Sequence, residues 1–350
     1  MTKRKWTYAS LALAAGMLTG VPASMADPVA EFFSGRALKL NVPSGAGGTY
    51  GLIAQIISRH MPRHLPGNPK ITLQIMPGGL KATNYVYNVA AKDGSLFNLL
   101  SQSMAVRQVV RPKGVKYDVR KFHAIGLITG LNGAFVVSNK HAVKTVADLS
   151  KHGIRVGTNH KSGYGYTTST MLNHYYGAKI KIITGYKSGA ASDLALERGE
   201  VDAKLSSWLS IKLRHPHWAK GEGAHTILQI GYKRAKDLPN VPTLIELAKN
   251  DREKKIFRLM SGNNAMARGL TAPPGVPKAR VDAYRKAFDA MIKDPKFIAE
   301  MEKRQFPLNP LNWKEYEEMI TELVNTPMDI IKEARKAYGK KSKKKKKKDS

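Results

Sequence analysis

Residues 38–57 read LKLNVPSGAGGTYGLIAQII and set the pattern for the rest of the chain. The apolar run at residues 38–42 predicts a short buried strand, and the apolar residues at 52–57 have helical spacing. The segment between them is rich in glycine and hydroxyl side chains, which favours a tight turn with an open backbone. The stretch therefore predicts a strand, a glycine-rich loop and a helix in that order.

The same alternation of strand and helix continues outward in two rounds. The first round adds strands at residues 71–76 and 96–100 around a helix at 84–91. The second round predicts strands at residues 154–157, 180–183 and 201–205, with helices at 168–176 and 190–198. This rhythm is typical of parallel sheets covered by helices. We expect two similar α/β lobes, each a mostly parallel sheet flanked by helices.

The C-terminal third is expected to be helical. Pro277 suits the start of a helix, and apolar residues then recur at helical spacing from Val281 to Met291. Two more helices are predicted at residues 313–323 and 328–337. We expect the domains to be residues 27–137 plus 232–339 for the first lobe and residues 138–231 for the second.

The N-terminus predicts export. Lys3, Arg4 and Lys5 precede an apolar run at residues 9–21, and Ser24-Met25-Ala26 resembles a signal-peptidase site. We expect a signal peptide at residues 1–26, cleavage after Ala26 and a periplasmic protein. The chain has no cysteine, which excludes disulfides, thiolate metal sites and cysteine nucleophiles.

The 350-residue chain carries a formal charge of +32. Setting aside the three basic residues of the leader and the net +7 of residues 340–350 leaves +22 for residues 27–339. Such a body attracts small acids and lipid phosphates, whereas export argues against nucleic acid as a partner. The lysine-rich tail is expected to be disordered, as a solvated terminus or an added segment. The alternative is adhesion of Lys340–Lys348 to an anionic membrane surface.

Polar, glycine-rich segments follow each predicted strand. In open parallel sheets, ligands bind beyond these carboxyl ends, and amides at a helix start favour anions. The loop at 44–50 lacks the Gly-Lys-Ser/Thr ending of a phosphate loop and the third glycine of a dinucleotide fingerprint. Neither it nor the second-lobe loop at 158–167 contains arginine, so we expect an anion held by main-chain amides. The predicted ligand-binding residues are Ser44, Gly45, Ala46, Gly47, Gly48, Thr49, Tyr50, Gly78, Ser101, Thr158, Ser162, Gly163, Tyr164, Tyr166, Thr167, Tyr186 and Ser206.

No catalytic or cofactor site is predicted. His60 and His64 have helical spacing, but Pro62 interrupts them, which favours surface histidines over a metal site. His215-Pro216-His217-Trp218 suggests metal binding or stacking, but a solvated loop is favoured because no acidic partner is adjacent in the sequence. We therefore expect a binding protein, with no enzyme activity, no cofactor and no metal.

Several motifs recur in an order and spacing that resemble a known family. These motifs are residues 44–48, 66–69, 84–94, 185–187, 197–202 and 273–277. Together they resemble the periplasmic receptors of tripartite tricarboxylate transporters, also called Bug-type proteins. The resemblance implies a two-lobe periplasmic-binding-protein fold, similar to type II, that closes on its ligand in a cleft between the lobes. It also implies a small organic acid as ligand, with its carboxylate held mainly by backbone amides of residues 44–50 and 158–167, and membrane transporter subunits as partners. Gly51 and Gln55 stand where relatives often have an acidic residue and an arginine. An exported binder outside transport, such as a sensor partner or a basic adhesion protein, is the alternative.

Overall fold

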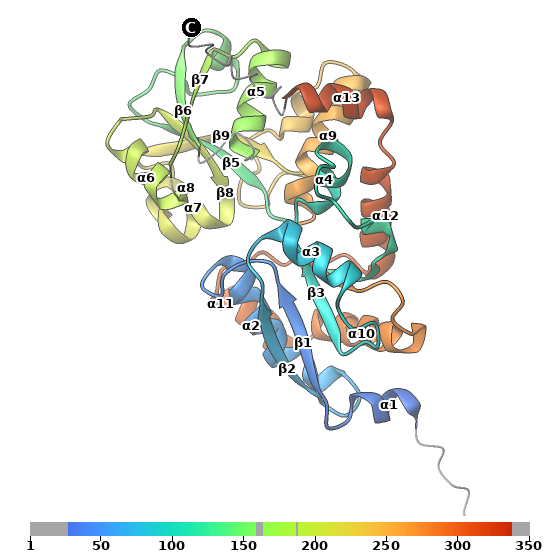
Figure 1. The fold of residues 1–350 in the computed structure, drawn as a ribbon. Helices are drawn as coiled ribbons and strands as arrows, with labels where there is room; N and C mark the ends of the chain where they lie inside the picture. Colours follow the sequence, from blue (N-terminus) through green and yellow to red (C-terminus); the bar gives the residue numbers. More distant parts are fainter. Residues whose placement is uncertain (1–26, 159–163, 187, 338–350) are drawn as a thin grey trace, which may run out of the picture.

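A computed structural model of the chain describes residues 27–158, 164–186 and 188–337, which form two lobes (Figure 1). Each lobe is built on one five-stranded sheet. The signal peptide and the lysine tail predicted above lie outside the described residues. Within the described part of the chain, no helix has both the length and the apolar character needed to cross a membrane.

The first sheet has the order β2-β1-β3-β10-β4. Its strands are β1 (Ala37–Val42), β2 (Lys70–Ile75), β3 (Leu96–Leu100), β4 (His123–Leu127) and β10 (Gly269–Ala272). Strand β1 pairs in parallel with β2 and β3, whereas β10 is antiparallel to both of its neighbours, β3 and β4. Four strands therefore run in one direction and one runs against them.

The second sheet repeats this plan in the order β7-β6-β8-β5-β9. Its strands are β5 (Gly133–Ser138), β6 (Ile154–Thr158), β7 (Ile180–Thr184), β8 (Ala203–Ser207) and β9 (Ala224–Ile230). Here β5 is the antiparallel strand, between β8 and β9. The predicted fold class is confirmed, with the correction that both sheets are mixed.

Helices cover the sheets of both lobes. The helices of the second lobe are α5 (Tyr164–Tyr176), α6 (Gly189–Glu197), α7 (Trp208–Arg214) and α8 (Pro216–Ala219). The other helices are α1 (Pro28–Phe33), α2 (Thr49–His60), α3 (Gly79–Asn88), α4 (Met104–Val110), α9 (Asp251–Ala265), α10 (Lys278–Met291), α11 (Pro295–Lys303), α12 (Trp313–Val324) and α13 (Met328–Ala337). Short 3₁₀ turns occur at Pro62–His64, Val119–Lys121, Ala147–Ser150 and Leu244–Leu247.

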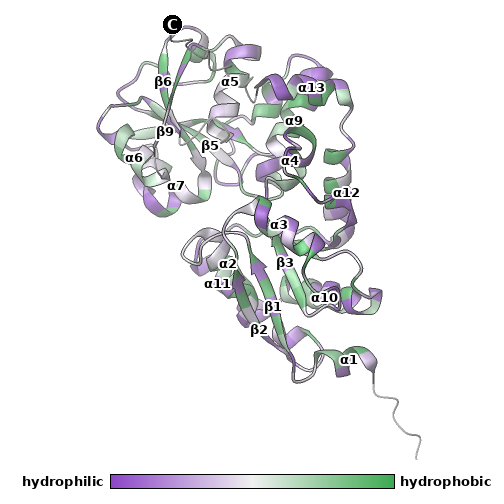
Figure 2. Cartoon of the chain, viewed as in Figure 1, coloured by the Kyte–Doolittle hydropathy of each residue, from purple (hydrophilic) through white to green (hydrophobic). Residues whose placement is uncertain are grey.

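Local sequence signals account for several of these helices. The predicted stripe of α10, from Val281 to Met291, is buried against the first sheet. Helix α12 begins at a capping box in which Asn312 and Glu315 satisfy each other's backbone N–H groups. Figure 2 shows α12 and α13 carrying both hydrophobic and hydrophilic residues, as expected of helices that pack on one side.

The expectation of an entirely helical C-terminal third was wrong. Strand β10 interrupts it and lies inside the first sheet, between β3 and β4, where all four of its residues are buried. A four-residue strand between two helices is too short to show a two-residue period, so its tertiary pairing decides its conformation.

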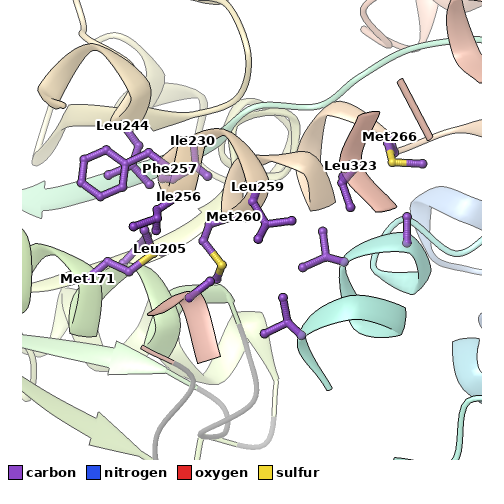
Figure 3. Close-up of a cluster of buried hydrophobic side chains, with 14 of the residues drawn as sticks. Met171, Leu205, Ile230, Leu244, Ile256, Phe257, Leu259, Met260, Met266 and Leu323 are labelled. Atoms are coloured by element: carbon purple, nitrogen blue, oxygen red, sulfur yellow. The ribbon is translucent and has the colours of Figure 1, made fainter. Parts of the chain in front are cut away.

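The two lobes share a continuous hydrophobic core through α9. Ile256, Phe257 and Met260 of α9 lie beside Met171 and Leu205 of the second lobe (Figure 3). The same cluster extends to residues of α12 and of β3 in the first lobe. Helix α13 also contacts α4, α5 and α9, so the C-terminal helices span both lobes (Figure 1).

The chain passes from the first sheet to the second between Leu127 and Gly133. It leaves the second sheet after Ile230 and re-enters the first at Gly269. The predicted lobe boundaries at 137/138 and 231/232 stay predictions, because they concern which residues move together.

Candidate functional site

The loops that follow β1, β2 and β3 meet at the carboxyl edge of the first sheet. The carbonyl of Pro43 accepts a hydrogen bond from Gly78 N at 3.2 Å. A Cβ atom on Gly79 would lie only 2.4 Å from Ser101 Oγ, so the second and third loops are in close contact. The structure thus brings together the predicted residues Ser44–Tyr50, Gly78 and Ser101.

The glycine-rich loop presents exposed backbone at the start of α2. Gly45, Ala46, Gly47 and Gly48 are exposed, and Gly48 N donates to Gly45 O at 3.3 Å. Gly48 caps α2 without a side-chain hydrogen bond, and no acidic residue occupies the first turn. The N–H groups of a 12-residue helix therefore face this loop without a side-chain anion.

Gly51 has a steric role under this loop. A Cβ atom at Gly51 would lie 1.9 Å from the carbonyl oxygen of Ala46, an impossible contact. The loop therefore folds down onto the first turn of α2 and requires glycine there. Any side chain at this position would need a different loop conformation.

Arg268 lies beneath the loop and is 3% exposed. Its guanidinium donates to Thr49 Oγ1, to Gln102 Oε1 at 3.2 Å and to the carbonyl of Ala267 at 2.6 Å. It also stacks over the ring of Tyr50, with Cζ 3.9 Å from the ring centroid. All of these partners are uncharged. Among the described residues no ion pair includes Arg268, and its Nε has no hydrogen-bond partner.

Burial shifts the pKa values of Arg268 and Tyr50 in opposite directions. Burial lowers the pKa of Arg268 from its usual value, although Tyr50 acts in the other direction. Burial raises the pKa of Tyr50, so its hydroxyl is neutral, and it accepts a hydrogen bond from Gln102 N at 2.8 Å. Because arginine keeps its proton even in apolar surroundings, the first-lobe site stands over a buried, uncompensated positive charge.

The second lobe places some of its predicted residues together. Gly185 N donates to Thr158 O at 3.2 Å, and a Cβ atom on Gly165 would lie 3.2 Å from Thr158 Oγ1. The ring of Tyr186 packs 3.2 Å from the corresponding position on Gly157. Thr158, Tyr186 and the start of α5 thus cluster at the carboxyl edge of the second sheet.

The remaining second-lobe predictions are only partly described. Ser162 and Gly163 lie outside the described residues, and of Tyr164 only the backbone in α5 is described. Thr167 is buried, and Tyr166 is half-buried on α5. Ser206 is half-buried in β8 opposite Ala134, near the carboxyl end of that strand.

The two loop clusters approach each other through α7. Leu209, in the first turn of α7, is buried in the hydrophobic cluster of the first lobe against which Tyr50 packs. Since α7 follows β8 directly, the carboxyl edges of both sheets lie toward the contact between lobes.

His60 and His64 lie against two different carboxylates. His60 Nε2 lies 2.7 Å from Glu300 Oε2, and His64 Nε2 lies 3.0 Å from Asp294 Oδ2. The interpretation of His60 as a surface residue was wrong, because it is 8% exposed and joins α2 to α11.

Arg268 is the site residue that sequence reasoning missed. The signal was present, because an arginine directly preceding the apolar Gly269–Ala272 is unusual at the edge of a core. It was overlooked because the strand itself was not predicted.

Comparison with known proteins agrees with this architecture. A profile of the family described as tripartite tricarboxylate transporter family receptor matches residues 69–335. The fold is similar to that of a TctC solute-binding protein from Polaromonas, with a TM-score of 0.67 at 18% identity over 85% of this chain and 99% of that one. It is also similar to the periplasmic binding protein BugD, with a TM-score of 0.62 at 20% identity over 86% of this chain and 98% of that one.

A third similar structure is MatC from Rhodopseudomonas palustris with bound malate, with a TM-score of 0.60 at 18% identity. The alignment covers 85% of this chain and all of that one. No curated protein sequence matches the chain.

Proposed function

The chain belongs to the receptor family of tripartite tricarboxylate transporters, and from this membership we propose that it captures a small di- or tricarboxylate outside the cytoplasm. It then delivers this acid to the membrane subunits of such a transporter. The proposal includes export to the periplasm with cleavage after Ala26.

The observation that carries the proposal is the charge arrangement beneath the first-lobe loop. A buried cation without a counterion is costly, and an arriving anion removes part of that cost. The uncapped start of α2 adds the partial positive charge of a helix N-terminus at the same place. Two independent sources of positive potential therefore converge on residues 44–50.

Main-chain amides make the direct contacts in this proposal. Arg268 is buried below Thr49 and Tyr50, so it acts as a positioning residue that orients Thr49 Oγ1 and adds charge from underneath. The exposed backbone of Gly45–Gly48 supplies N–H donors, and residues of the second-lobe cluster close on the other end of the acid. Charge-assisted hydrogen bonds of this kind are stronger than neutral ones.

The ligand class is supported by relatives. One similar protein was solved with malate and another, from R. palustris, with adipate. Both molecules carry two carboxylates, which suits a site with one loop cluster on each lobe.

Titration calorimetry with the mature protein tests the proposal. We expect a member of a panel of malate, adipate and citrate to bind, and its methyl ester to bind at least tenfold more weakly. Equal binding of acid and ester, or no binding of any acid by the folded protein, would contradict the proposal.

A pair of substitutions at one residue tests the role of the amides. Gly47→Pro removes an N–H and should weaken binding by about 10- to 100-fold, as expected for loss of a charge-assisted hydrogen bond. Gly47→Ala is the control, because it keeps the amide and its methyl group meets no atom within 4 Å. Lys161→Ala, in the second-lobe loop, should cost less than Gly47→Pro. If Gly47→Pro leaves the affinity for the acid unchanged while Lys161→Ala abolishes binding, the amides are not the main contacts.

A further inference from the structure

A second group of polar side chains lies at the other end of the strands of the second sheet, away from the loops described above. A pocket of about 500 Å³ opens where β5 ends and β9 begins, between Ser138 and Ala224. Its wall includes Glu197 at the end of α6 and His217 and Trp218 of α8. Figure 1 shows α6, α7 and α8 gathered on this part of the second lobe.

Glu197 and His217 of this wall lie close to His215, and all three side chains carry metal-binding atoms. Glu197, His215 and His217 each place one ligand atom within 4.8 Å of the others. His215 Nδ1 lies 3.5 Å from Glu197 Oε1. Two ligands on a tetrahedral ion with bonds of about 2.1 Å are separated by about 3.4 Å, so this pair already has the required spacing. Glu197 and His217 are exposed, and their side chains can turn to close the remaining gap.

The surroundings of His215 hold its ring in place for coordination. The ring stacks on Trp218 with 3.9 Å between centroids and an interplanar angle of 13°. Its Nε2 lies 3.0 Å from Asp193 Oδ2, a contact that is close but poorly aligned, so that a small rotation completes the hydrogen bond. A proton on Nε2 leaves the lone pair on Nδ1, directed toward Glu197. Carboxylate–histidine pairs of this kind fix the tautomer of metal-binding histidines.

Asp193 is itself held firmly enough to serve in this role. Lys204 Nζ donates to its Oδ1, and Arg214 Nε donates to its Oδ2 at 2.9 Å. These two contacts fix the position of the carboxylate that faces His215 Nε2.

We propose that Glu197, His215 and His217 form a binding site for a divalent late first-row metal ion, with Zn²⁺ as its preferred occupant. Two imidazoles and one carboxylate, with a fourth position open to the pocket, match the ligands that zinc takes in proteins. Calcium and magnesium are disfavoured because they prefer oxygen ligands alone. The site is separate from the proposed carboxylate site and does not depend on it.

The basic surroundings limit the affinity. Lys140, Arg155 and Arg198 line the same pocket. Two of them are partly neutralised, since Arg155 pairs with Asp202 at 2.6 Å and Arg198 lies 4.0 Å from Glu200. We expect a dissociation constant on the order of micromolar, weaker than that of a closed structural zinc site.

Metal titration of the mature, tag-free protein after dialysis against EDTA tests the proposal. We expect calorimetry to show one high-affinity Zn²⁺ per chain and Co²⁺ to give the visible absorption of a four-coordinate ion. His217→Ala and Glu197→Gln alter exposed side chains, so both variants should fold, and each should weaken Zn²⁺ binding at least tenfold. His215→Ala should do the same.

Controls separate this site from general binding to surface histidines. His152→Ala removes another exposed histidine of the second lobe and should bind Zn²⁺ like the wild type. Wild-type affinity in both His217→Ala and Glu197→Gln, or the absence of a saturable Zn²⁺ site, would overturn the proposal.

Discussion

Among the described residues, each lobe buries one lysine or arginine side chain, and the two side chains have opposite surroundings. Lys204 of β8 is 1% exposed and has Asp193 as an ion-pair partner, with further hydrogen bonds to Gly189 O at 3.0 Å and Ser192 Oγ at 2.9 Å. Arg268, directly ahead of β10, is 3% exposed and contacts only uncharged partners. Both sheets have five strands with one antiparallel strand in the fourth position, so the two charges lie in similar frameworks and differ in their immediate partners.

This difference separates a structural charge from one that is available to a ligand. Lys204 is already neutralised by its own lobe, and burial lowers its pKa while Asp193 opposes that effect. Arg268 has no such counterion within the described residues and lies under the loop that the family resemblance assigns to the ligand. Buried, strongly perturbed groups next to a binding loop are candidates for function.

The largest effect is expected from breaking the paired charge. Lys204→Met leaves Asp193 buried with a weaker set of partners and should lower the free energy of unfolding by about 3–5 kcal/mol. Urea denaturation followed by circular dichroism measures this. The double variant Lys204→Met/Asp193→Leu should recover much of the loss. If the single variant is as stable as the wild type, the pair is not the structural charge described here.

Removing the charge of Arg268, which has no counterion among the described residues, should change the free energy of unfolding little and reduce the affinity for the acid. Arg268→Met leaves no carboxylate buried without a partner, so the free energy of unfolding should change by no more than about 1 kcal/mol. Affinity for the acid should fall by about 10- to 100-fold, as for the loss of one charged hydrogen-bonding group. Calorimetry and urea denaturation on one sample measure both.

Arg258→Met is the matched control for Arg268→Met. Arg258 also stacks over a tyrosine, with Cζ 4.2 Å from the ring centroid of Tyr232, but it is paired with Glu322. This variant should bind the acid like the wild type. Equal loss of affinity in both variants would mean that Arg268 has no special role.

A smaller, pH-dependent effect on the free energy of unfolding is expected at Glu300. In contrast to Arg268, the basic side chains around Glu300 have a carboxylate partner. Burial alone would raise the pKa of Glu300, but hydrogen bonds from His60, Arg59 and Arg304 lower it to about 2 from 4.5. The folded state therefore gains stability above pH 4.5 and loses it as the pH falls toward 2. The shift corresponds to about 3 kcal/mol, which solvent screening of these half-exposed arginines reduces to about 1–2 kcal/mol.

Glu300→Gln tests this expectation. The variant should be less stable than the wild type at pH 7, and the two should converge near pH 2. Thermal or urea unfolding at several pH values measures the gap. A gap that does not change between pH 7 and pH 2 would show that the carboxylate charge is not its source.

The smallest effect is expected from the most highly charged segment. Deleting residues 340–350 removes a net charge of +7, yet it should leave acid affinity and melting temperature nearly unchanged. The composition of this segment predicts disorder, and the charges of a disordered segment are screened by salt and are not held at a binding site. Binding to anionic vesicles should fall, most clearly at low salt. Loss of acid affinity on deletion would show that total charge, and not its placement, governs binding.

The sequence was informative where a local pattern determines the structure. The strand–loop–helix unit at 38–57 and the buried stripe of α10 were both predicted, because each follows from periodicity within a few turns. Strand β10 was missed, since its four residues adopt their conformation through pairing with β3 and β4. Arg268 was missed with it. The partner of His215 and His217 was also hidden, because Glu197 lies 18 residues before His215 in the sequence.

Strand β10 is synthesised long after β3, the strand with which it pairs, and this order has a consequence for folding during biosynthesis. All strands of the second sheet come from residues 133–230, so this lobe can assemble as one contiguous segment. The first sheet, in contrast, leaves one edge of β3 unpaired until residues 269–272 have been made. That edge is a run of five buried residues, four of them leucine or phenylalanine, and such an edge is prone to aggregation when exposed. The nascent chain therefore needs protection over an interval of about 170 residues, and a chain that stops before Gly269 can complete only its second lobe.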